Sequence, residues 1–272
     1  MATSRNPVLN ADTFRPAGIA TDPRLDGGSG LPDPFTTAQR SDTMTIRGVI
    51  SKSAILLLLV AASFSFAWDR TLTSDGGSLP LLFGASILGF VLSLVISFKP
   101  TMAPFLAPVF ALAQGLALGA VSALYEYQAT YSNGVPSGYD GIVFQAAVAT
   151  MAVFGAMLFL FRTGLITVTD RMRSVVKTAM LGIVGVYLLS FVLSLFGTTV
   201  PMIHEGGAVG IGFSLLVLGV ASFMLLVDFD AIQQGVAAGA PRYMEWYSAF
   251  ALLVTLVWIY MEMLRLLSKM RR

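Results

Sequence analysis

The sequence predicts an all-α membrane protein, folded as a bundle of seven transmembrane helices. Of its 272 residues, 56% are hydrophobic and only 12% are charged, whereas soluble domains carry about 25% charged residues. The charged residues are also unevenly placed: seven long windows contain no Asp, Glu, Lys or Arg. The segments between these windows alternate between basic and non-basic, as expected for a chain that crosses a bilayer repeatedly.

Residues 1–44 are expected to form a disordered cytosolic tail, and residues 45–272 a seven-helix transmembrane domain. The tail is rich in Pro, Gly, Asp, Thr and Arg, as in "TDPRLDGGSGLPDPF", and offers few apolar groups to bury. No apolar run occurs in the first 40 residues, so the start is not a signal peptide. A short docking motif within the tail is the alternative interpretation.

Each charge-free window is expected to be one helix, because lipid supplies no hydrogen-bond partners for an irregular backbone. A crossing takes about 20 residues. The first window is short but can extend back over Lys52, whose long stem lets the ammonium group reach the interface. The last must extend either back past Glu245 or forward through Glu262. The windows are 53–68, 76–98, 100–125, 141–161, 178–204, 206–227 and 246–261.

Lys and Arg place the N-terminus on the cytoplasmic side. The outer loops between spans carry only Arg70, and the 126–140 segment carries no basic residue. Seven crossings leave the basic tail "RLLSKMRR" outside, which conflicts with this rule. Either the last segment does not cross the membrane fully, or the earlier spans determine the topology and the tail is carried outside. Seven crossings are preferred. The inner segments carry Arg40, Arg47, Lys52, Lys99, Arg162, Arg171, Arg173, Lys177 and Arg242.

Several classes of function are excluded by absent residues. The chain has no cysteine and one histidine, His204 in a predicted outer loop, which removes disulfides, thiolate chemistry and multi-histidine zinc sites. The spans lack the serine motif and histidine of rhomboid-like proteases, and no Gly-x-Gly-Asp run marks a presenilin-type protease. Lys269 lies too close to the end to hold retinal. We therefore expect no enzyme and no cofactor, and the net charge of +2 indicates no nucleic-acid partner.

The stretch "MLLVDFDAIQQG" places Asp228 and Asp230 at the end of the sixth window. If the Gly-rich start of that span is loop, the helix begins near Val209 and about 20 residues carry it through Asp228. Both acids would then lie near the inner boundary, where water is scarce. The alternative is a water-exposed helix end, although negative charge there opposes the helix macrodipole.

Two further acids flank the last window. Glu262, in "VWIYMEMLRLL", is needed to complete the span, and carboxylates inside spans usually face a cavity or a partner. Its alternative is an intrahelical pair with Arg265. Glu245 is most simply an acid at a helix start beside Trp246, with a secondary gating role as the alternative.

The combination of "FDAIQQG", "IYMEMLRLL", "MTIRGVISKSAILLLLVAASFSFAW" and "EWYSAFALLVTLVWIYMEMLRLL" resembles the Bax-inhibitor (transmembrane Bax-inhibitor-motif) family, in its long-tailed bacterial branch. The resemblance covers about residues 43–268. It implies a seven-helix bundle with the last helix at the centre. It also implies a pH-sensitive calcium leak gated by a buried carboxylate pair between the sixth and seventh helices. Asp230 matches the first acid and Glu262 the second, with Asp228 as an extra acid.

The spacing of this chain departs from that pattern. Asp230 lies 11 residues before Pro241 and Glu262 lies 21 residues after it, a mismatch of about 15 Å in an antiparallel hairpin. The partner of Asp230 is therefore Glu262, or Glu245 if the mismatch holds. The arginine latch of the family's second helix has no counterpart, because residues 76–98 contain no basic residue.

Together with the buried carboxylates, this resemblance implies an inner-membrane channel that leaks a cation, Ca²⁺, under proton control, with the lipid bilayer as its surroundings. Ca²⁺ prefers oxygen ligands, which Asp228, Asp230 and Glu262 would supply transiently. Two close carboxylates in a low dielectric cannot both ionise cheaply, so the cluster would also sense protons. The alternative is a non-conducting membrane regulator that binds a partner protein such as a membrane protease.

Overall fold

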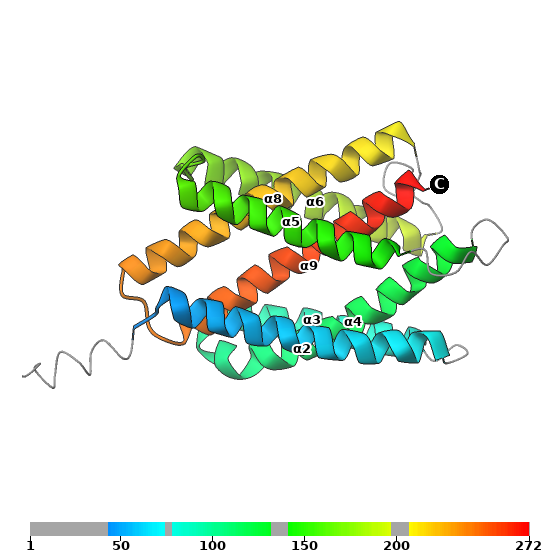
Figure 1. Ribbon diagram of the computed structural model, residues 1–272, viewed down its shortest axis with the longest axis horizontal. Coiled ribbons are helices and arrows are strands. Elements are labelled where there is room, and N and C mark those ends of the chain that lie inside the picture. Colours follow the sequence, from blue (N-terminus) through cyan, green and yellow to red (C-terminus); the bar gives the residue numbers. More distant parts are fainter. Residues whose placement is uncertain (1–42, 74–77, 132–140, 197–206, 272) are drawn as a thin grey trace, which may run out of the picture. The chain divides into compact units, whose positions relative to one another are not determined.

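The computed structural model describes residues 43–73, 78–131, 141–196 and 207–271, and the expected all-α fold is confirmed there. These residues form seven long helices, each apolar enough to cross a membrane, and no strand (Figure 1). The helices are α2 (Ile46–Thr73), α3 (Ser78–Phe98), α4 (Ala103–Tyr131), α5 (Ile142–Thr163), α6 (Asp170–Leu195), α8 (Ala208–Ala237) and α9 (Met244–Met270), with a 3₁₀ turn η2 (Pro100–Met102) before α4.

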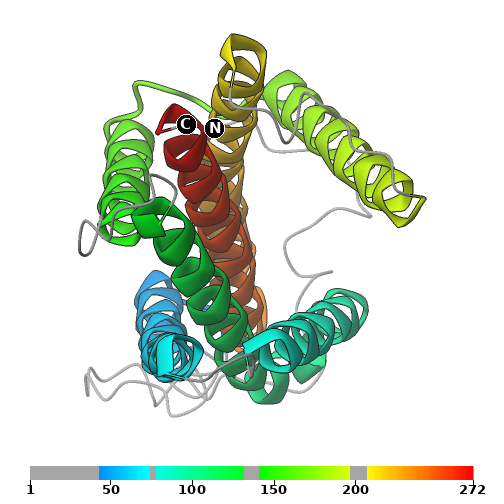
Figure 2. The same cartoon turned by 90° about the vertical axis from the view of Figure 1, so that its right-hand side faces the viewer.

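The last helix lies at the centre, as the resemblance implied. Helix α9 packs against α2, α4, α5 and α8, and Figure 2 shows it running between them. Helix α6 packs mainly on α8, and α3 mainly on α4. The acids of α9 therefore face other helices, whereas much of α2, α3, α5 and α6 is left to face lipid.

Small residues let α2 and α4 approach closely. A Cβ atom built on Gly115 would lie 2.4 Å from the carbonyl oxygen of Val60, and one on Gly119 would lie 2.4 Å from that of Phe64. The two glycines are four residues apart and so share one face of α4. This is the close helix contact that small residues permit in membranes.

The turn between α8 and α9 has a clear local cause. Gly239 adopts a left-handed conformation with φ of 64°, which favours glycine. Its N–H donates to the carbonyl oxygen of Val236, while that of Ala240 donates to Gly235, closing the end of α8. Pro241 follows and cannot continue the helix. Pro241 therefore lies at the turn between α8 and α9, as expected from the sequence.

The described chain begins by packing on this same turn. The N–H of Met44 donates to the carbonyl oxygen of Ala240 at 2.7 Å, and the Met44 side chain is 3% exposed in a cluster with Leu225, Phe229 and Leu256. Met44, expected to end the tail, thus belongs to the bundle. Residues 1–42 and His204 lie outside the described residues, so the disorder of the tail stays a prediction.

Deleting residues 2–40 is expected to leave membrane insertion and stability unchanged, because the deletion spares Thr43 and Met44. Thermal unfolding of the purified protein in detergent measures this. A drop of several degrees in Tm relative to the full chain would show that the removed segment packs on the bundle.

Ser132 and Ser174 are expected to face opposite sides of the membrane. Ser174 is exposed near the start of α6, and Ser132 follows α4, outside the described residues. Because the chain has no cysteine, Ser132→Cys and Ser174→Cys each create a single thiol for a membrane-impermeant label. Labelling of both thiols from one side would contradict seven crossings.

Candidate functional site

The carboxylates singled out in the sequence lie on α8 and α9, but the structure gives each a different partner. Asp228, Glu245 and Glu262 are buried, and Asp230 is partly buried. Among the described residues, no group of three His, Cys, Asp or Glu side chains lies close enough to hold a metal ion. The expected Ca²⁺ site shared by Asp228, Asp230 and Glu262 is therefore not assembled in this conformation.

Asp228 faces α9. Its Oδ2 accepts a hydrogen bond of 2.6 Å from the Thr255 hydroxyl, and the residue is only 9% exposed. Within the described part of the chain no basic side chain forms an ion pair with it. Thr255 lies 11 residues after Met244 and 15 before Met270, so the contact is near the middle of α9 rather than at a helix end.

Asp230 points to another side of α8. Its Oδ2 forms an ion pair with Arg173 of α6, and the Gln234 amide donates to the same oxygen at 3.3 Å. Two residues rotate a helix by about 200°, so only one of the two aspartates can face α9. The acid that does so is Asp228, and the assignment of Asp230 to that position by resemblance is corrected.

Glu262 is held in a cluster with α6. Its Oε2 accepts hydrogen bonds from Tyr187 at 2.8 Å and from Arg265 at 2.7 Å. Arg265 also lies over the Tyr187 ring, 4.8 Å from its centroid. The Glu262 side chain is 1% exposed, and its Oε1 is buried without a hydrogen-bond partner among the described residues. The alternative interpretation, an intrahelical pair with Arg265, is what the structure shows.

The distance between the acids follows from the helix register. Since Thr255 faces Asp228, Glu262 lies seven residues further along α9, or about 10 Å. This agrees with the mismatch that the sequence predicts for Asp230 and Glu262. Asp230 and Glu262 therefore do not pair in this structure. Glu245 does not pair with Asp230 either, because the Glu245 carboxylate is bonded to Thr45 and Lys52.

Glu245 fastens the start of α2 to the start of α9. Its Oε1 accepts hydrogen bonds of 2.9 Å from both the N–H and the hydroxyl of Thr45, and its Oε2 forms an ion pair with Lys52. A Cβ atom on Gly48 would lie 2.0 Å from Oε1, so only glycine leaves room for the carboxylate. The sequence places Glu245 at a helix start but does not show that this carboxylate also binds Thr45 and Lys52 at the start of α2.

Lys269 was also missed, because the sequence assigns it to an exposed tail. It is 6% exposed, and its Nζ donates to the Gly210 carbonyl and the Ser214 hydroxyl of α8, each at 3.0 Å. On α9, Thr255, Glu262 and Lys269 are spaced seven residues apart. On α8, Ser214 and Asp228 are 14 residues apart, which is twice that interval. Such spacing keeps side chains on one face of a helix, and it was the signal in the sequence that could have revealed this polar row.

Seven helices able to cross a membrane, with buried polar and charged side chains of the last helix facing α6 and α8, define a multi-pass membrane protein. Residues 6–272 match the family model described as Bax inhibitor 1 like. The chain belongs to this family. No curated protein matches it significantly.

Proposed function

We propose that the protein is a pH-sensitive cation leak channel, with Ca²⁺ as the cation, and that Asp228 is its proton switch. The observation that carries this proposal is the environment of Asp228: it is buried between α8 and α9, with a single hydroxyl as its hydrogen-bond partner and no basic side chain paired with it in the described residues. An ionised carboxylate in such a place is costly unless water or a cation reaches it.

The proton state then sets the helix contacts. A protonated Asp228 is neutral, so it fits the packed interface with Thr255 and leaves the path closed. An ionised Asp228 favours any arrangement in which α8 and α9 move apart enough to admit water and a cation. Loss of the proton therefore favours the conducting state, and the leak should increase as pH rises.

The rest of the polar row supports a path that is closed in this conformation. Glu262 is already neutralised by Arg265, and Lys269 places a buried positive charge beside Ser214. These cations oppose the entry of Ca²⁺ from that end of α9. A separation of α8 from α9 would expose Glu262 Oε1, which is buried without a hydrogen-bond partner among the described residues and suits an ion ligand.

The orientation follows from the charge asymmetry of the sequence, with the N-terminus cytoplasmic and the protein in the inner membrane. With that orientation Glu245 and Lys52 lie at the cytoplasmic end and Lys269 at the outer end. The protein passes ions and catalyses no reaction.

Ca²⁺ flux into liposomes tests this function. The purified full-length protein, reconstituted with a Ca²⁺ indicator trapped inside, is expected to raise the uptake rate several-fold over protein-free liposomes at neutral pH, and less at acidic pH. Liposomes carrying the same protein after heat denaturation serve as the control. Uptake no faster than in protein-free liposomes would favour the alternative, a non-conducting regulator that binds a membrane protein partner.

A further inference from the structure

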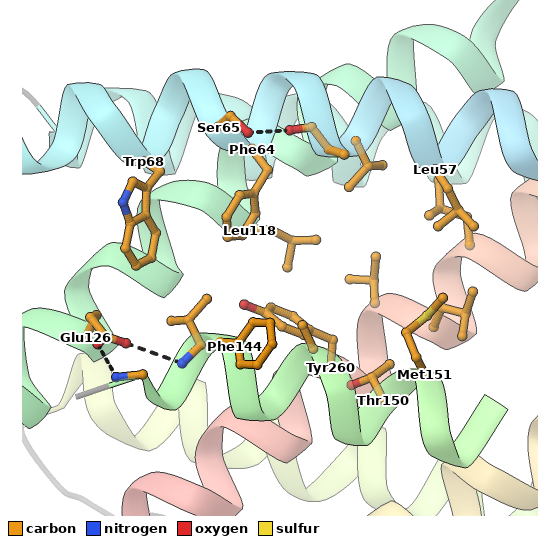
Figure 3. Close-up of a pocket in the computed structure, with 18 residues that line it drawn as sticks. Leu57, Phe64, Ser65, Trp68, Leu118, Glu126, Phe144, Thr150, Met151 and Tyr260 are labelled. Atoms are coloured by element: carbon orange, nitrogen blue, oxygen red, sulfur yellow. Dashed lines mark hydrogen bonds between the residues drawn. The ribbon is translucent and has the colours of Figure 1, made fainter. Parts of the chain in front are cut away.

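A cavity of about 520 Å³ lies between α2, α4, α5 and α9, away from the polar row. Its volume is typical of sites that bind small ligands, about 300–1,000 Å³. Helices α2 and α5 form opposite walls, and α9 contributes Leu253, Leu256, Val257 and Tyr260 between them (Figure 3). The cavity is open to the surroundings, because its lining residues Phe144 and Met151 are 73% and 58% exposed.

The carboxylate and hydroxyl groups that line the cavity already have hydrogen-bond partners within the protein. Glu126 accepts from the N–H groups of Gly141 and Val143 at 2.6 and 3.3 Å, as Figure 3 shows. The hydroxyl groups in the lining have partners as well: Ser65 donates to the Ala61 carbonyl oxygen, Thr150 donates to that of Ala146, and Tyr260 is hydrogen-bonded to Ser122. The remaining wall is almost entirely hydrocarbon and aromatic, so the part of a ligand that lies inside the cavity must be apolar.

The length of the cavity matches one leaflet of a bilayer. Along α2 its lining runs from Leu57 to Trp68, 11 residues and about 17 Å, while half of the hydrocarbon core measures about 15 Å. Trp68, Glu126 and Gly141 lie at the end towards the α4–α5 loop, where a headgroup would meet water. Tryptophan is enriched at this depth of the membrane. The cavity therefore spans from an interface towards the bilayer centre.

We propose that this cavity is a binding site for a membrane phospholipid, whose acyl chain enters sideways between α2 and α5 and lies along α9. The lipid headgroup stays at the interface beside Trp68. This site is separate from the ion path and does not depend on the proposed leak. Because the acyl chain contacts the face of α9 formed by Leu253 and Val257, the bound lipid becomes part of the packing that holds the central helix.

Quenching of Trp68 fluorescence by a brominated lipid tests the proposal. The variant Trp246→Phe/Trp258→Phe leaves Trp68 as the single tryptophan of the three in the chain. In detergent, a phosphatidylcholine with a dibrominated acyl chain should quench Trp68 with a curve that saturates near stoichiometric lipid. A linear rise with lipid content would show simple partitioning and would overturn the site.

A matched pair of variants locates the binding. Ala61 and Ala62 are both exposed, but only Ala61 lines the cavity. In the single-tryptophan background, Ala61→Phe should abolish saturable quenching, and Ala62→Phe should leave it unchanged. Ala147→Phe, from the opposite wall, should repeat the loss if Ala61→Phe fails to fold. Equal quenching in both members of the pair contradicts the proposal, as does saturation by dibromostearic acid without saturation by the phospholipid.

Discussion

Replacing Glu245 by alanine is expected to lower the free energy of unfolding by about 3–5 kcal/mol, the range for breaking a buried ion pair by removing one partner. The Lys52 side chain is 15% exposed and would be left in the bundle without its carboxylate. The N–H and hydroxyl of Thr45 would lose their shared acceptor as well. The start of α2 would thus lose its connection to the central helix.

Chemical denaturation in detergent measures this loss of unfolding free energy, and two further variants serve as comparisons. Asp230→Ala breaks an ion pair whose arginine is 27% exposed, so it should cost clearly less. The double variant Lys52→Met/Glu245→Leu removes both charges and should recover most of the stability, since apolar replacement of a buried pair is often neutral. If Glu245→Ala unfolds no more easily than Asp230→Ala, the carboxylate does not hold α2 in place.

Asp228→Asn is expected to remove the pH dependence of Ca²⁺ flux and to hold the flux at the low level of the acidic wild type. The amide mimics the protonated carboxyl in shape and charge, so the arrangement with Thr255 persists at every pH. Its flux should therefore be several-fold below that of the wild type at alkaline pH and equal to that of the wild type at acidic pH. Flux assays in liposomes between acidic and alkaline pH give this profile directly.

Two comparison variants separate the switch from its surroundings. Asp230→Asn alters the Arg173 pair at the side of the bundle and should keep the wild-type pH profile, the reverse of what the family resemblance suggests for the two aspartates. Among the described residues, Thr255 is the hydrogen-bond donor to Asp228. Thr255→Val removes this donor and should shift the rise in flux to higher pH, because the ionised form loses its support. A flat profile in Asp230→Asn together with a normal one in Asp228→Asn would assign the switch to the other acid.

The helices could be predicted because the membrane imposes a simple rule on sequence. Seven windows without charge correspond to the seven long helices, and the helix start expected near Val209 agrees with the start of α8 at Ala208. The last helix could not be bounded in this way. Helix α9 extends in both of the directions left open by the sequence, over Glu245 and through Glu262, because its central position gives both acids partners inside the bundle.

The site was predicted less well because it depends on which faces of two helices meet. Spacing alone showed that one of Asp228 and Asp230 faces α9, but choosing between them needs the rotation of α8, which is set by packing along its whole length. The Glu245–Lys52 pair joins residues 193 positions apart, and no local pattern reports such a contact. The row of Thr255, Glu262 and Lys269 was visible in the sequence as a seven-residue repeat, and it is the feature to seek in similar chains.

The proposal that Asp228 is the proton switch is tested most directly by measuring the protonation of this carboxyl group. Infrared difference spectroscopy of the reconstituted protein across a pH titration gives this measurement. We expect a protonated-carboxyl band that is present at acidic pH, absent from Asp228→Asn, and lost over the same pH interval in which Ca²⁺ flux rises. A band that persists unchanged in Asp228→Asn, or that titrates in an interval where flux is constant, would contradict it.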